Sequence, residues 1–217
     1  MTEDRRTWVR LARISAAIGR ETLDRGGVLI HGGLAATPLS PAGRNFDSPG
    51  GSRGGAGILL AGRSGVGKST ASRRLPPPWR SLCDDVTLVV RDEAGRYWAH
   101  PFPTWSRFFG EEAGDGSDTW DLQETVPLNA IFVLEQGPDD RAEPIGGGHT
   151  LALLSELANQ ATNRFSTGCP IEAIAAFHLA RYHNLCALVR AVPAHLLHVS
   201  LTGAFWGEVA RVLYPTV

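Results

Sequence analysis

One glycine-rich stretch constrains the fold of this chain more than any other feature. Residues 62–70 read GRSGVGKST and fit the P-loop pattern G-x-x-x-x-G-K-[ST] at every fixed position. The apolar run GILL at 57–60 indicates a buried strand before the motif, and residues 69–74 can form a helix after it. Glycines let the backbone turn so that its N–H groups point at phosphate oxygens. The sequence therefore predicts a strand, a phosphate-binding loop and a helix, in that order.

The motif also predicts which residues bind a nucleotide. Lysine in this position reaches the β- and γ-phosphates, and the following serine can ligate Mg²⁺. The chain has 21 lysines and arginines, of which Lys68 is the only lysine. A compact ammonium fits a glycine-lined loop better than a planar guanidinium does, which favours a functional lysine. The predicted binding residues for ATP are Gly62, Arg63, Ser64, Gly65, Val66, Gly67, Lys68, Ser69 and Thr70.

Composition narrows the class of protein. The chain has 217 residues, of which 43% are hydrophobic and 20% charged, and this predicts one globular domain. A net charge of −1 and no apolar run of roughly 20 residues argue against nucleic acid and membrane as partners. The three cysteines form no C-x-x-C pair, so we expect thiols in a cytoplasmic protein.

Apolar spacing and glycine or proline breaks predict the remaining elements. Residues 1–25 should hold a helix, and residues 28–31 a strand that places His31 at its end, before two glycines. Residues 37–56 should be a flexible loop, with 41–55 mobile in the absence of ligand, and residues 136–148 a second loop. Further strands are expected at 86–90, 97–100, 130–134 and 195–201, and further helices at 149–163, 171–192 and 205–213. This mixture predicts an α/β fold.

A P-loop needs a further acidic group to hold or orient Mg²⁺, and two candidates exist. Asp84 and Asp85 follow a short element after the motif, whereas Glu135 ends the apolar run 130–134. We favour the aspartates because one carboxylate can hold the metal while its neighbour accepts a proton from a hydroxyl. Their mutual repulsion would also raise one pKa. The alternatives are a solvated acidic turn and Glu135 as the metal-side acid.

Three segments together resemble a known family. The sequence IHGG at 30–33, the strand and P-loop at 57–70, and SLCDDV at 81–86 resemble the catalytic core of HPr kinases. The resemblance implies the phosphoenolpyruvate-carboxykinase-like P-loop fold, with a mixed sheet and flanking helices, and a single catalytic domain over 1–217. It also implies that Asp85 and Asp84 take the base and Mg²⁺ roles, with Asp85 favoured as the base, and that His31 lies near the transferred phosphate. Asp84 would then hold Mg²⁺ together with Ser69 of the P-loop.

The chain departs from that family after the aspartates. The second glycine-rich signature of HPr kinases is not recognisable, and HPFPTWSR stands at 100–107 instead. This stretch is a candidate lining for an acceptor site, or a proline-broken loop that packs aromatic residues. The chain is more similar to the HPr-kinase-related proteins of bacterial peptide-modification clusters, some of which phosphorylate a serine of a lasso precursor peptide.

The expected function is therefore a kinase that uses ATP and Mg²⁺, with Lys68, His31, Asp84 and Asp85 as its catalytic residues. The expected acceptor is a serine hydroxyl of a peptide or small protein, and we also allow for a homo-oligomer. Two alternatives stay open: a kinase for a small molecule such as free serine, and a non-catalytic nucleotide-binding regulator of a biosynthetic assembly.

Overall fold

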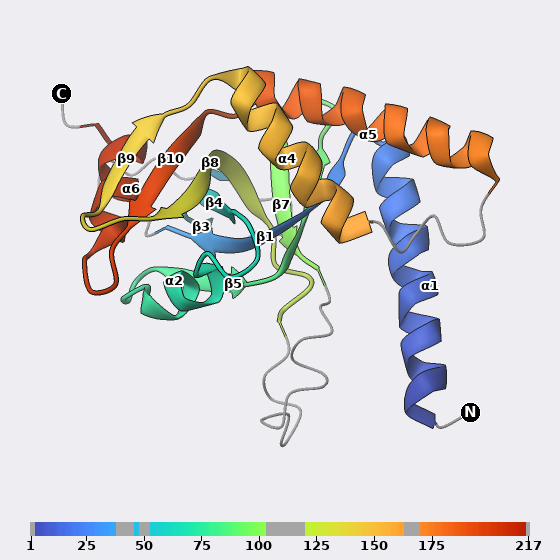
Figure 1. Ribbon diagram of the computed structural model, residues 1–217, viewed down its shortest axis with the longest axis horizontal. Helices are drawn as coiled ribbons and strands as arrows, with labels where there is room; N and C mark the ends of the chain where they lie inside the picture. Colours follow the sequence, from blue (N-terminus) through green and yellow to red (C-terminus); the bar gives the residue numbers. More distant parts are fainter. Residues whose placement is uncertain (1–2, 38–45, 48–52, 103–119, 163–169, 216–217) are drawn as a thin grey trace.

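The computed structural model describes residues 3–37, 46–47, 53–102, 120–162 and 170–215 (Figure 1). Five helices flank the main sheet of this described part. They are α1 (Glu3–Asp24), α2 (Lys68–Arg74), α4 (Gly147–Thr162), α5 (Ile171–Ala191) and α6 (Phe205–Leu213). The strands are β1 (Val28–Ala36), β2 (Phe46–Asp47), β3 (Arg53–Gly54), β4 (Gly57–Ala61), β5 (Arg80–Cys83), β6 (Val86–Arg91), β7 (Tyr97–Pro101), β8 (Val126–Gln136), β9 (Arg141–Pro144) and β10 (Ala194–Val199).

The main sheet has eight strands and is mixed, as predicted. Strand β8 pairs in parallel with β4 on one side and with β10 on the other, while β1 runs antiparallel to β4, β5 and β6. Because β6 pairs with β7, and β7 with β8, the pairings of β4, β1, β6, β7 and β8 close into a circuit. This arrangement brings the ends of β4 and β5 to opposite edges of β1.

Apolar side chains fill both faces of the sheet. Along β8, Ile131 and Val133 belong to a core shared with α4 and α5, whereas Phe132 and Leu134 belong to a core shared with α2 and α6. Burial on both faces explains why this segment reads as a continuous apolar run. Figure 1 shows α4 and α5 across one face and α2 on the other, while α1 extends away from the sheet. No helix in the described part is long and apolar enough to cross a membrane.

The predicted strand at 28–31 is shorter than the strand in the structure. Strand β1 continues to Ala36, so His31 lies within the strand rather than at its end. Gly32 and Gly33 belong to the strand because its neighbours approach closely: a Cβ on Gly32 would lie 3.0 Å from the Leu60 carbonyl oxygen. The glycines here allow close packing of backbones and do not mark a turn.

Two predicted loops contain strands. Strand β9 and the start of α4 lie within 136–148, because β9 pairs with the edge of β10, which is distant in sequence. Within 37–56, β2 pairs with β3 over two residues each, while residues 38–45 and 48–52 lie outside the described part. The predicted mobility of 41–55 therefore remains a prediction. The last three helices and the strand β10 lie within one or two residues of their predicted positions.

Candidate active site

The P-loop stands between β4 and α2, as its motif predicts. Strand β4 ends at Ala61 and is buried throughout, and α2 begins at Lys68. Gly65 has φ +80° and Gly67 has φ +106°, a backbone conformation that L side chains rarely adopt. The turn between strand and helix therefore depends on glycine at these two positions.

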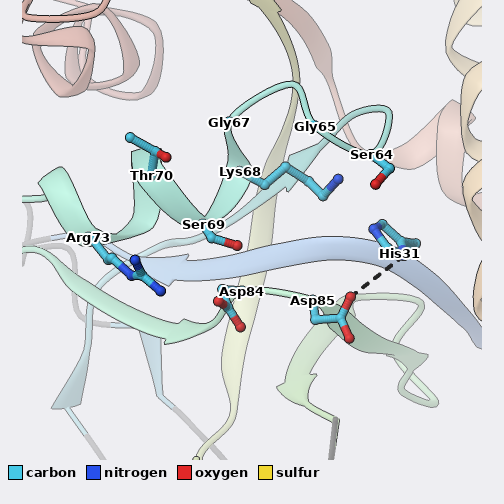
Figure 2. Close-up of a pocket in the computed structure, with 10 residues that line it drawn as sticks. All are labelled: His31, Ser64, Gly65, Gly67, Lys68, Ser69, Thr70, Arg73, Asp84 and Asp85. Carbon is cyan, nitrogen blue, oxygen red and sulfur yellow. Dashed lines mark ion pairs between the residues drawn. The ribbon is translucent and has the colours of Figure 1, made fainter. Parts of the chain in front are cut away.

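A cavity of about 470 Å³ opens beside this loop (Figure 2). Four elements of the chain contribute to it: the P-loop, α2, the middle of β1 and the turn between β5 and β6. The residues that line it are His31, Ser64, Gly65, Gly67, Lys68, Ser69, Thr70, Arg73, Asp84 and Asp85. The structure thus brings together the four predicted catalytic residues and most of the predicted nucleotide-binding residues.

Lys68 lies folded over its own loop. Its ammonium Nζ donates to the carbonyl oxygens of Gly62 at 2.8 Å and Arg63 at 3.0 Å, and the residue is only 6% exposed. Burial lowers the pKa of Lys68, and the nearby charge of Asp85 opposes that shift. The loop carbonyls therefore hold a cation at the edge of the cavity, facing a carboxylate.

The two aspartates occupy a turn, not an extended strand. Strand β5 ends at Cys83 and β6 begins at Val86, so the backbone bends at Asp84 and Asp85. Figure 2 shows the Asp84 carboxylate below Ser69 and the Asp85 carboxylate toward His31. The bend explains why neighbouring side chains can both face one cavity, although neighbours in a strand point to opposite sides.

Asp84 carries the feature that best fits a metal. Its Oδ1 atom is buried, and no hydrogen-bond partner for it exists among the described residues. A buried oxygen without a partner is costly, and a cation would satisfy it. Oxygen ligands suit Mg²⁺, which is commonly held by one or two carboxylates and by substrate phosphates. The described part has no group of three His, Cys, Asp or Glu that could hold a metal. Asp84 and Ser69 both line the cavity, so their oxygens are the ones that could hold Mg²⁺ together with substrate phosphates.

His31 lies beside Asp85, with 3.6 Å between His31 Nδ1 and Asp85 Oδ1. Burial lowers the pKa of His31, the charge of Lys68 lowers it further, and Asp85 raises it. The two lowering causes prevail, which favours the neutral imidazole near pH 7. The 3.6 Å separation is longer than a hydrogen bond, so a neutral ring would have to move closer before its N–H could donate to the Asp85 carboxylate.

Arg73 lines the cavity although no sequence argument singled it out. It follows Ser69 by four residues in α2, so both lie on one face of the helix. Figure 2 shows its guanidinium on the side of Asp84 away from His31. The helical spacing from Ser69 was the signal that could have identified it.

Other sequence candidates lie elsewhere. Gly62, Arg63 and Val66 are not among the residues that line this cavity. The Arg63 side chain is 76% exposed, and its Nη2 lies 3.9 Å from Glu156 Oε2 on α4. Glu135 is also absent from the lining, and its Oε2 lies 3.9 Å from His198 Nδ1.

The predicted acceptor lining at 100–107 is only partly described. His100 Nε2 lies 3.1 Å from the Thr125 hydroxyl, and burial lowers the His100 pKa. Residues 103–107 lie outside the described part, so an acceptor role for this stretch remains a prediction.

Comparison with known proteins gives a family. The family model described as SynChlorMet cassette protein ScmC matches residues 1–214. The chain belongs to this family. No curated protein matches the chain. A solved structure similar to it is the Hpr(Ser) kinase/phosphatase from Coxiella burnetii, with 11% sequence identity and a TM-score of 0.38 over 85% of this chain and 95% of that one. A likeness at that score carries no argument about activity, and the relation to lasso-peptide clusters stays a prediction.

Proposed function

We propose that this protein is an ATP-dependent kinase that transfers the γ-phosphoryl group to a serine hydroxyl of a peptide or small protein. One observation carries the proposal. A single cavity combines the P-loop residues Lys68 and Ser69 with two carboxylates, and one of these has a buried oxygen that lacks a partner. A phosphoryl transfer site needs a phosphate cradle, a metal position and a proton acceptor, and these residues supply all three.

The phosphates of ATP would lie along the loop and the start of α2. Backbone N–H groups of Gly65 and Gly67 would donate to phosphate oxygens, and Lys68 would neutralise charge on the β- and γ-phosphates. Ser69 and Asp84 would hold Mg²⁺. When bound, Mg²⁺ supplies charge neutralisation on the transferred phosphoryl group.

Asp85 is the proposed base. As the acceptor oxygen forms its bond to the γ-phosphorus, the bond from that phosphorus to the β–γ bridging oxygen breaks and ADP leaves. The hydroxyl proton passes to the Asp85 carboxylate. His31, 3.6 Å from that carboxylate, would hold it in the orientation that accepts the proton.

The choice of acceptor has two supports. The residues at 30–33, 57–70 and 81–86 resemble the core of HPr kinases, which phosphorylate a protein serine. The matched family is described as a cassette protein, so we take the acceptor to be another product of the same cassette.

The test is phosphate transfer from radiolabelled Mg·ATP. The parent protein is incubated with L-serine and, separately, with each serine-containing peptide or small protein encoded in the cassette. We expect label on one of the peptides or proteins and ADP formation that depends on adding it. Label on serine instead would make the protein a small-molecule kinase, and ATP binding without transfer would make it a regulator.

Two variants of the lysine sharpen this test. Lys68→Ala and Lys68→Arg should both keep the parent's circular dichroism spectrum and lose transfer. The arginine variant retains the charge, but its planar guanidinium does not fit the position between two loop carbonyls. Transfer at the parent's rate in a folded Lys68→Ala protein would remove the P-loop from the proposal.

A further inference from the structure

A second cavity, of about 360 Å³, adjoins the first. It lies between α2, the end of β8 and the segment that follows β10. Gly67 and Thr70 line both cavities, which therefore adjoin at the start of α2. Its volume falls within the range of roughly 300–1,000 Å³ that is usual for small-molecule sites.

The wall opposite α2 is fixed by hydrogen bonds. Arg74 Nη1 donates to the Ser200 carbonyl oxygen at 2.7 Å, and Arg74 Nη2 donates to that of Gly203. The backbone N–H of Ser200 donates to Asp140 Oδ1 at 2.6 Å. These bonds tie the segment after β10 to α2 and to the loop after β8. The cavity is therefore bounded by segments that the protein's own hydrogen bonds hold together.

The lining suits a flat heterocycle with polar edges. Val66, Ala71, Val199 and Leu201 supply apolar surface, and the amide of Gln136 can both donate and accept hydrogen bonds. Leu201 is 84% exposed, which leaves a large apolar side chain uncovered at the rim. Among the residues that the structure describes, no carboxylate or histidine lines the cavity, so they offer it no side chain that readily accepts the proton of a hydroxyl.

The position of the cavity follows the direction of a bound triphosphate. Lysine of a P-loop reaches the β- and γ-phosphates, so the γ end lies on the side of Lys68 and Asp85. The α-phosphate, ribose and base must then leave on the side of Thr70, where the second cavity begins.

We propose that this second cavity binds the purine base of the nucleotide, with the Gln136 amide on the edge of adenine and Leu201 against its face. Glutamine pairs in this way with the N6 and N7 atoms of adenine in other complexes. The inference rests on the proposed function in so far as a triphosphate must occupy the P-loop.

The test compares a ligand that has a base with one that lacks it. Calorimetry measures the affinities of Mg·ATP and Mg·tripolyphosphate for the parent, Gln136→Ala, Leu201→Ala and Leu179→Ala. Leu179 is a matched control because it is 57% exposed on α5 and does not line either cavity. We expect Gln136→Ala and Leu201→Ala each to weaken the binding of ATP about three- to tenfold. For Gln136→Ala this is the effect of losing one neutral hydrogen bond, and we expect the lost apolar contact in Leu201→Ala to have a similar effect. Tripolyphosphate should bind all four proteins equally.

The outcomes separate the two proposals. If the parent binds ATP no more tightly than tripolyphosphate, or if both cavity variants bind ATP like Leu179→Ala, the base does not lie in the second cavity and the P-loop proposal stands. If the parent binds neither ligand, both proposals are overturned.

Discussion

Lys68 shows how one residue is specified by its surroundings. Two loop carbonyl oxygens accept hydrogen bonds from its ammonium in place of the water that burial removes. Asp85 supplies the opposite charge across the cavity. An arginine could not place a single compact charge in that position. Lys68 is nevertheless the only lysine of the chain, which otherwise uses arginine. The choice of lysine at this position is thus a local chemical requirement.

At this scale we predict that the neighbouring aspartates differ in function. Asp84→Asn should weaken Mg²⁺ dependence and ATP affinity together, because its buried oxygen is the proposed metal ligand. Asp85→Asn should bind Mg·ATP nearly as well as the parent and transfer phosphate about 10²–10⁴-fold more slowly, the usual contribution of a general base. Calorimetry and transfer rates check both. If both variants behave like the parent, the pair has no part in binding or transfer, and Glu135 should be substituted next.

The titration of His31 offers a second prediction. Its pKa lies below the ordinary value of 6.5, so the imidazole is neutral above that pH. Lys68→Ala removes a positive neighbour and should raise the His31 pKa, whereas Asp85→Asn removes a negative neighbour and should lower it further. The measurement is the imidazole proton shift against pH by NMR. Equal pKa values in all three proteins would show that these groups do not face one another.

Arg73 gives a third residue-level prediction. Its guanidinium lines the cavity beside Asp84, on the side away from His31. Because it adds positive charge where phosphates would lie, Arg73→Ala should weaken ATP binding about ten- to 150-fold, the range of a hydrogen bond to a charged group. Arg73→Lys should recover part of that loss, and thermal unfolding of both variants should match the parent. Unchanged ATP affinity in Arg73→Ala would place this side chain outside the nucleotide site.

Among the elements, the pairing of β4 with β8 supports the P-loop directly. Gly57 begins β4, and a Cβ there would lie 2.6 Å from Val126 Cγ2 and 2.8 Å from the Pro127 carbonyl oxygen. Gly57→Ala should therefore lower the free energy of unfolding by about 1–3 kcal/mol, the usual cost of overpacking. Urea denaturation measures this change.

Gly207 provides the matched control for that substitution. It lies within α6, and a Cβ there would meet no described heavy atom within 4 Å outside its own helix turn and chain neighbours. Gly207→Ala should leave the free energy of unfolding at the parent's value or raise it by up to about 1 kcal/mol, because alanine favours helices. Equal urea midpoints for Gly57→Ala and the parent would contradict the close approach of β4 and β8.

At the scale of the whole molecule, the cavity beside the P-loop couples ligand binding to folding. Its residues come from β1, the P-loop, α2 and the turn between β5 and β6, so it exists only when these elements are assembled. A ligand that binds the folded state alone stabilises it by mass action. At about one hundred times its dissociation constant, Mg·ATP should add about 2.7 kcal/mol to the free energy of unfolding.

For a chain of this length that increment corresponds to a rise in Tm of roughly 5–10 °C. Calorimetric scans with ATP, with and without Mg²⁺, measure it. Lys68→Ala should lose most of the rise, and Asp84→Asn should lose the difference that Mg²⁺ makes. A Tm that no nucleotide changes would contradict nucleotide binding at this site.

The sequence by itself determined the features that depend on near neighbours. The P-loop needs glycines, a lysine and a helix start within nine residues, and buried runs such as β8 are visible because both faces are apolar. The positions of helices α4, α5 and α6 and of strand β10 followed for the same reason, since their periods repeat every few residues.

Only the tertiary structure decided which distant residues share the site. His31 meets Asp85 because β1 pairs with β6, and this pairing joins segments on either side of the P-loop. Strand β9 exists because β10 offers an edge, and the second cavity exists because Arg74 holds the segment after β10. Such contacts leave no periodic signal, because their free energy comes from pairing and packing between segments that are far apart in the chain.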